Sequence, residues 1–266
     1  LLGALVFALV GLGGGPEQEE KEAYKEDPRV KRAVDRALDY LAKTQEANGS
    51  WRAKIGKFAM QRDLGQANEH VGITAIALLA FMGDGNLPDR GRYADVVARG
   101  MEYVMTCVQE TGYVAANGSN MYTHAYATLF LAEIYGMTGR EDVKKALVKS
   151  IDLLSKCQNS QGGWRYEPKP ADADLSVTVC QVQALRAARN KGIAVKKTII
   201  DRALEYVKKC DLPDGGFSYQ AGIPRKITLV GSSAAGLVCY YSMGIYDERA
   251  HERHFQYLLN SCDGGG

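Results

Sequence analysis

The chain after residue 26 alternates apolar and polar positions with the period of an α-helix. Asp27 precedes Pro28, and this pair is typical of a helix N-cap and first helical position. In the helix that follows, residues spaced by three or four positions form one apolar face. They are Val30, Val34, Leu38 and Leu41. The pattern predicts an amphipathic helix that begins at Pro28 and buries one side.

Four later segments are apolar on nearly all sides and predict buried helices. They are expected at residues 71–82, 121–135, 174–189 and 229–243. Because amphipathic segments lie between them and strand-type alternation is absent, the chain predicts an all-α fold of about nine helices in two layers, with the apolar helices inside. Glycines at the ends of the apolar segments are expected to terminate these helices. They are Gly83, Gly136, Gly192 and Gly244.

The helical pairs repeat with a period of about fifty residues. Each copy carries a basic residue, then a glutamine or its replacement nine positions later, then a glycine and an aromatic residue. The glutamine position holds Gln45, Val108, Gln158, Asp211 and Asp263, and the aromatic position holds Trp51, Tyr113, Trp164 and Phe217. The fifth copy is expected to start at His254. Such a repeat indicates helical hairpins stacked side by side.

This spacing resembles the QW repeat of the squalene cyclases and protein prenyltransferases, over residues 27–266. The resemblance implies an α/α toroid, in which six helical hairpins close around an apolar cavity. It also implies that the repeat residues brace the turns between hairpins and are not catalytic. These structural residues are Gln45, Trp51, Gln158, Trp164 and Phe217. The copies with Val108 and Asp211 depart from the pattern and are expected to brace less well. Four hairpins and the outer helix of a fifth are fewer than six, so we expect an incomplete toroid that further sequence beyond Gly266 closes.

The candidate catalytic residues are Asp174 and, beside it, Asp172. They lie at the start of the third apolar helix and are similar to the acid motif of squalene-type cyclases, in which the residue matched by Asp174 protonates an alkene. That chemistry needs a raised carboxyl pKa and aromatic walls. Leu175 stands where the motif has another aspartate. The alternative is a helix N-cap, which predicts a lowered pKa because the carboxylate accepts backbone N–H groups.

Four further residues near the starts of apolar helices are expected to line the cavity. They are His70, His124, Tyr122 and Tyr126. The segment around His124 loosely resembles the one that supplies a zinc ligand in protein prenyltransferases. Their zinc site also needs an aspartate and a cysteine two residues apart, and the chain has no Asp-x-Cys. We therefore expect no metal and no cofactor, with the histidines acting as helix caps or neutral hydrogen-bonding groups.

Composition narrows the function classes further. The chain has 266 residues with 46% hydrophobic and 24% charged, which is ordinary for a globular protein. Its net charge of +2 is spread along the chain, so nucleic-acid binding is not expected. Four of the cysteines precede the glutamine position of successive repeats, about 10 Å apart, and are expected to be free thiols. They are Cys107, Cys157, Cys210 and Cys262.

The N-terminal segment differs from the rest of the chain. Residues 1–15 are apolar and uncharged and resemble the core of a secretory signal, followed by a charged linker at 16–27 and the toroid at 28–266. An alternative is that residues 1–15 form a buried helix of the domain. The sequence predicts an exported, non-catalytic or ligand-binding toroid. The alternative is a terpenoid cyclase-like or prenyltransferase-like enzyme that acts on an isoprenoid, with Asp174 as the acid.

Overall fold

The computed structural model describes residues 27–54, 67–223 and 229–263, and every structural statement below refers to these ranges. The apolar segment at residues 1–15 lies outside them, as does the linker except for Asp27. No helix in the described ranges has the length and apolar character to cross a membrane.

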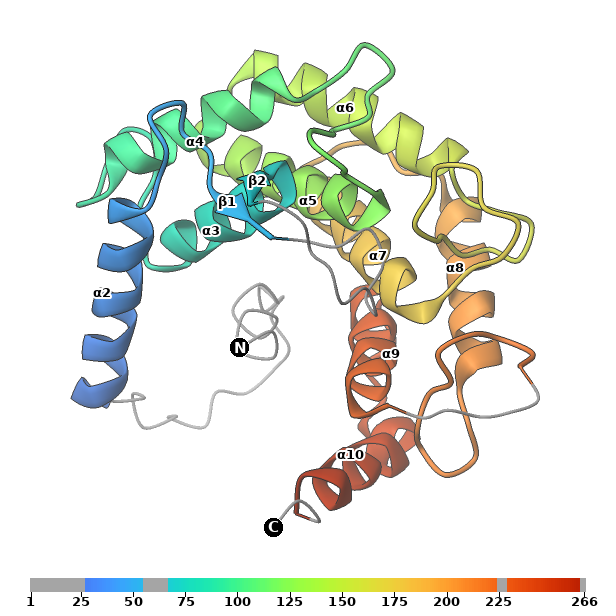
Figure 1. Cartoon of the computed structure of the whole chain (residues 1–266). Coiled ribbons are helices and arrows are strands. Elements are labelled where there is room, and N and C mark those ends of the chain that lie inside the picture. Colours follow the sequence, from blue (N-terminus) through green and yellow to red (C-terminus); the bar gives the residue numbers. More distant parts are fainter. Residues whose placement is uncertain (1–26, 55–66, 224–228, 264–266) are drawn as a thin grey trace.

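The described residues form nine α-helices, as the repeat predicts, and these follow an arc (Figure 1). The outer helices are α2 (Pro28–Lys43), α4 (Ala94–Thr106), α6 (Glu141–Lys156), α8 (Lys197–Cys210) and α10 (Glu248–Asp263). The inner helices are α3 (Val71–Gly83), α5 (Met121–Thr138), α7 (Leu175–Asn190) and α9 (Val230–Ser242). Successive inner helices pack against one another, and α3 and α5 also contact the outer helices α4 and α6.

The polarity of each helix explains its layer. The inner helices are buried on most sides: α5 alone places Phe130, Leu131 and Ile134 fully inside. The outer helices bury one stripe, as Val143, Leu147 and others do on α6. The core therefore lies between the two layers, and the fold is the expected all-α arrangement of helical hairpins.

Two details of the predicted helices are wrong. The two apolar residues Val30 and Val34 of α2 are exposed, because α2 lies at one end of the arc and its main helix contact is with α3. Helix α5 continues through Gly136 to Thr138, and Gly139, with φ of 63°, ends it instead. By contrast, the N-cap at Asp27 is confirmed, since its side chain accepts the backbone N–H of Arg29.

The expectation that strands are absent is wrong at one place. Strand β1 (Arg52–Ala53) pairs antiparallel with β2 (Asn68–Glu69), each two residues long. Both strands lie in the connection between α2 and α3, so their pairing stays within this connection and leaves the two helical layers unchanged. A two-residue pair has no periodicity that a sequence pattern could reveal.

The same turn follows four of the outer helices. After α6, Asn159 N–H donates to the Gly163 carbonyl at 3.0 Å, and Gly162 N–H donates to the Asn159 carbonyl at 3.1 Å. Gly162 has φ of 95°, and a Cβ there would lie 2.3 Å from the Arg202 carbonyl oxygen of the next outer helix. Only glycine fits this contact. The glycines of the other three turns, Gly49, Gly112 and Gly215, have φ of 89° and meet the next outer helix in the same way.

The fifth copy of the repeat starts one residue earlier than expected. Gly215 faces the carbonyl oxygen of Arg253, and not that of His254. Arg253 thus holds the place of Arg99, Lys149 and Arg202 on the earlier outer helices. The sequence match placed the start at His254 because the residues after it fit the repeat equally well.

Candidate functional site

The N-terminal ends of the inner helices carry the candidate residues, and three of these ends are capped by side chains. His70 Nδ1 accepts the Ile73 N–H at 3.4 Å at the start of α3. Asn120 caps α5, and Asp174 caps α7. An imidazole, an amide and a carboxylate therefore each accept a backbone N–H of the first helical turn at equivalent N-cap positions. His70 is buried, which lowers the pKa of its imidazole.

One turn further into each inner helix, a second side chain accepts a backbone N–H from the preceding turn. The acceptors are Thr74, His124, Thr178 and Ser233, and the donors in the same order are Trp51, Val114, Trp164 and Phe217. Val114, and not Tyr113, therefore occupies the aromatic position of the second copy. The equivalence assigns His124 to the same structural contact as two threonines and a serine.

His124 does not face an open surface, contrary to the expectation that it lines the cavity. It has no exposed area. Its Nδ1 accepts the Val114 N–H at 3.2 Å, so the proton is on Nε2, which donates to the Ser150 carbonyl at 3.3 Å. Burial lowers the pKa of His124 to about 4, so the ring is neutral at pH 7.

Asp174 is fully buried and its carboxyl group has three donors. Oδ1 accepts the Val177 N–H at 2.8 Å and the Ser176 hydroxyl at 2.7 Å, and Oδ2 accepts the Tyr219 hydroxyl at 3.1 Å. Burial nevertheless raises the pKa of this carboxyl above its ordinary value, against the opposing effect of these hydrogen bonds. The expectation that a capping aspartate has a lowered pKa is therefore wrong here, because desolvation is the larger effect.

Three tyrosine hydroxyls connect to the Asp174 carboxyl, one directly and two through another hydroxyl group. Tyr122 on α5 contacts the Ser176 hydroxyl at 2.5 Å, and Tyr166 contacts Tyr219 at 2.7 Å. The rings of Tyr122 and Tyr166 lie 5.9 Å apart. Two chains of hydroxyl groups thus run from Asp174, one through Ser176 and one through Tyr219. Burial is the largest cause that raises the pKa of Tyr122 and of Tyr219, so both are neutral at pH 7.

Sequence reasoning missed Tyr166 and Tyr219. A signal was present, because each follows the aromatic position of its repeat, Trp164 or Phe217, by two residues. The carboxyl group of Asp172, the second candidate acid, shares no hydrogen-bond partner with that of Asp174. The Asp172 side chain is half exposed and pairs with Arg165 at 2.5 Å.

The glutamine and tryptophan residues of the repeat make matching contacts. Gln45 Nε2 donates to the carbonyls of Gly49 and Val96, and Gln158 Nε2 donates to those of Gly162 and Ile199. The indole N–H groups of Trp51 and Trp164 each donate at 2.9 Å to the preceding outer helix. Phe217 is fully buried against Gly236, where a Cβ would lie 2.3 Å from its ring.

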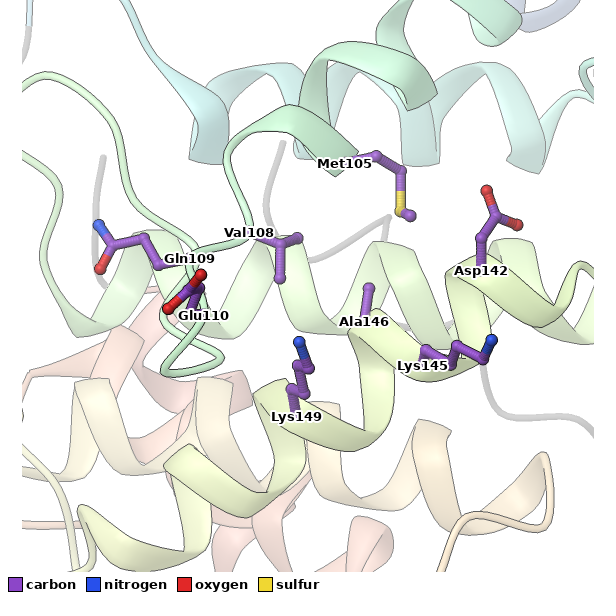
Figure 2. Close-up of a pocket in the computed structure, with 8 residues that line it drawn as sticks. All are labelled: Met105, Val108, Gln109, Glu110, Asp142, Lys145, Ala146 and Lys149. Atoms are coloured by element: carbon purple, nitrogen blue, oxygen red, sulfur yellow. The ribbon is translucent and has the colours of Figure 1, made fainter.

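A surface pocket of about 250 Å³ lies elsewhere, between the outer helices α4 and α6 (Figure 2). We call it the Val108 pocket. It is lined by Met105, Val108, Gln109, Glu110, Asp142, Lys145, Ala146 and Lys149. None of these residues belongs to an inner helix, so the pocket is distinct from the Asp174 site.

Metal-ligating groups are not gathered at any of these sites. Within the described ranges, no cluster of three or more His, Cys, Asp or Glu side chains could hold a metal ion. The six cysteines are free thiols, of which Cys157, Cys180, Cys210 and Cys239 are buried.

The two helical layers, the shared turns and the capped inner helices define an α/α toroid fold. The sequence profile of the prenyltransferase alpha-alpha toroid domain family matches residues 29–261. The chain belongs to this family.

Solved structures of similar fold include terpene cyclases. A variant of the type II terpene cyclase MstE from Scytonema, in complex with its substrate geranylgeranyl dihydroxybenzoate, has a TM-score of 0.59 at 18% identity, covering 88% of this chain and 64% of that chain. Another MstE variant, bound to the product merosterolic acid A, has a TM-score of 0.59 at 18% identity, over 90% of this chain and 66% of that one. A protein from Actinoplanes has a TM-score of 0.55 at 14% identity, over 89% of this chain and 67% of that chain. The chain thus spans slightly less than two thirds of the MstE chains, and at these identities the likeness concerns the fold.

Proposed function

We propose that this chain is a non-catalytic α/α toroid domain that binds an apolar, isoprenoid-like ligand on its inner surface. The non-catalytic part of this proposal rests on the burial and the hydrogen bonding of the Asp174 carboxyl group. Both of its oxygens accept hydrogen bonds and it has no exposed area. An acid that protonates an alkene must present its proton to the substrate. Asp174 instead fills the capping position that His70 and Asn120 fill in neighbouring hairpins.

The ligand-binding part rests on the face of α5 that no other helix of the described ranges covers. This helix packs against α3 and α7 within the inner layer and against α6 outside, which leaves one face toward the concave side of the arc. Tyr122 and Tyr126 lie one turn apart and are half-buried, and the buried Leu129 follows them at helical spacing. Such a strip offers apolar rings beside hydroxyl groups, which suits a long hydrocarbon with a polar end. The MstE structures, which bind a geranylgeranyl compound and its product, have the same fold.

Isothermal titration with geranylgeraniol tests this proposal. We expect saturable binding to the parent protein and at least a tenfold weaker affinity for Tyr126→Ala, because one ring of the strip is removed. Tyr40→Ala is the matched control, since Tyr40 is exposed on the outer helix α2 and should leave the affinity unchanged. Equal affinities of parent and Tyr126→Ala would show that the ligand does not bind there.

A cyclase is the second candidate, and two observations favour it. Burial raises the pKa of Asp174, and tyrosine rings that could stabilise a carbocation lie nearby. Incubation with geranylgeranyl dihydroxybenzoate, followed by mass spectrometry and chromatography, separates the two functions. Cyclised product from the parent but not from Asp174→Asn, with both proteins folded, would establish the cyclase. Bound but unchanged compound supports the non-catalytic domain.

We also propose that residues 1–15 direct export, on the sequence pattern alone. Fusion of residues 1–27 to alkaline phosphatase, which is active only after export, tests this directly. Phosphatase activity equal to that of the fusion without these residues would overturn the proposal.

A further inference from the structure

The four repeated turns differ in one hydrogen bond. The carbonyl of the turn glycine accepts a side-chain nitrogen in three of them: Gln45 Nε2 reaches Gly49, Gln158 Nε2 reaches Gly162, and His254 Nδ1 reaches Gly215 at 2.7 Å. In the second turn, no donor from residues 27–54, 67–223 or 229–263 reaches the Gly112 carbonyl. The second turn is therefore the exception among four otherwise matching structures.

The cause is the residue at the glutamine position. The side chain of Val108 has no hydrogen-bonding group, and it ends before the place where a glutamine amide would lie. The Val108 pocket is found there, and Ala146, which corresponds to Val96 and Ile199 on the other outer helices, lines it. Val108, Ala146 and Lys149, which line the pocket, correspond to Gln45, Val96 and Arg99 of the first turn, so the pocket lies where a glutamine side chain at position 108 would extend.

The first turn shows how that space is used when it is filled. The Gln45 carboxamide donates through Nε2 to the carbonyls of Gly49 at 3.1 Å and Val96 at 2.9 Å. Its oxygen Oε1 accepts the Arg99 guanidinium at 2.6 Å. One planar group therefore satisfies two acceptors and one cation at once.

Lys149 takes the place of Arg99 in the second turn and has no such partner. Its backbone carbonyl faces Gly112 as that of Arg99 faces Gly49. Within the described residues, its ammonium group makes no hydrogen bond or ion pair. Figure 2 shows the Lys149 side chain extending in the direction of Val108. Where the second turn has Val108 in place of glutamine, the Lys149 ammonium and the Gly112 carbonyl are therefore both left without a hydrogen-bond partner from the described residues.

We propose that the Val108 pocket binds the primary carboxamide of a glutamine side chain presented by a partner protein. The carboxamide would donate to the Gly112 carbonyl and accept from the Lys149 ammonium, as the Gln45 carboxamide does with its own partners. The Ala146 carbonyl is the weaker acceptor, because it already accepts the Ser150 hydroxyl at 3.0 Å. The pocket opens between outer helices, so a side chain on another protein's surface can enter it.

Nuclear magnetic resonance titration with N-acetylglutamine methylamide tests the site on the full chain. We expect saturable shifts of the Gly112 and Tyr113 amide signals, with a dissociation constant of roughly 1–10 mM for a ligand of this size. The matched probe is the γ-methyl ester of N-acetylglutamate methylamide, which has the same length but lacks side-chain N–H donors. N-acetylglutamate methylamide measures simple attraction to the lysine. Both control probes should bind at least fivefold more weakly.

Two variants complete the test. Val108→Gln supplies the carboxamide within the chain, so it should abolish the shifts and raise the melting temperature by about 2–4 °C through the restored hydrogen bonds. Gln45→Val should create an equivalent site in the first turn, because it frees both the Gly49 carbonyl and the Arg99 guanidinium, and should add shifts at Gly49. Equal binding of the amide and the ester, or unchanged binding to Val108→Gln, would overturn the proposal. The proposal would also be overturned if the parent protein showed no shifts with the glutamine probe at a concentration well above about 10 mM, the upper end of the expected dissociation constant.

Discussion

Removal of the Trp164 side chain tests the packing between hairpins most directly. The indole is fully buried, and its Nε1–H donates to the Leu154 carbonyl at the end of α6 at 2.9 Å. The backbone of Trp164 also accepts the Asp174 N–H at 3.0 Å, which fixes the loop before α7. Trp164→Ala keeps this backbone bond and removes the ring, so the variant isolates the contribution of the side chain.

The size of the effect follows from burial and one hydrogen bond. Truncation of a buried tryptophan to alanine costs about 3–5 kcal/mol, because a cavity remains. The Leu154 carbonyl still accepts the Cys157 N–H at 3.2 Å, so its lost bond to the indole adds little. For a domain of this length each 1 kcal/mol lowers the melting temperature by about 2–4 °C. We therefore expect a decrease of about 6–20 °C.

Thermal unfolding followed by circular dichroism, with urea unfolding for the free energy, measures this effect. Trp164→Phe is the control, because Phe217 shows that a phenyl ring fits the same position in the fourth hairpin. It should cost about 1–2 kcal/mol, mainly because the smaller phenyl ring leaves part of the indole volume empty. A Trp164→Ala protein that melts within 2 °C of the parent would contradict the structural role of this residue.

Two further predictions concern single positions. Burial raises the pKa of Asp174 in the folded protein, so this group favours the folded state at pH below about 4 and loses that contribution as the pH rises through the folded pKa. Asp174→Asn should remove this pH dependence and cost less than about 1 kcal/mol at pH 7, because asparagine also caps helices; a larger loss in urea unfolding would mean that the charge itself is needed. Gly162→Ala should cost about 2–4 kcal/mol, since the new Cβ meets the Arg202 carbonyl oxygen at a left-handed position. Gly118→Ala, also left-handed but with no atom within 4 Å, should cost about 1 kcal/mol, and equal losses would show that the contact is unimportant.

Much of the fold could be predicted from local sequence patterns. Helix period, the Asp27–Pro28 start and the repeated Gly-x-aromatic spacing depend on residues close together in the chain, so they can be read without a partner. The errors occurred where a distant segment decides the outcome. Val30 and Val34 belong to an apolar face that α2 leaves exposed, and Gly136 remains helical while the Lys191 side chain packs against it.

The candidate site was predicted less completely. The sequence placed Asp174 and Tyr122 at the starts of inner helices, and the structure brings these two residues together through Ser176. Tyr219 comes from the connection after α8, and no local pattern places it on the Asp174 carboxyl. The direction of the Asp174 pKa shift also escaped prediction, because it depends on how completely other segments exclude water.

The sequence by itself determined the class of fold, the order of the helices and the repeated turns, because the pattern of each is carried by residues close together along the chain. Only the tertiary structure decided which repeat positions are equivalent: His124 corresponds to threonine and serine, and Val114 to tryptophan. It also decided that Val108 leaves a pocket, while the fourth turn obtains its donor from His254 on another helix. Hydrogen bonds between hairpins join residues about fifty positions apart, so they become visible only once the layers are packed.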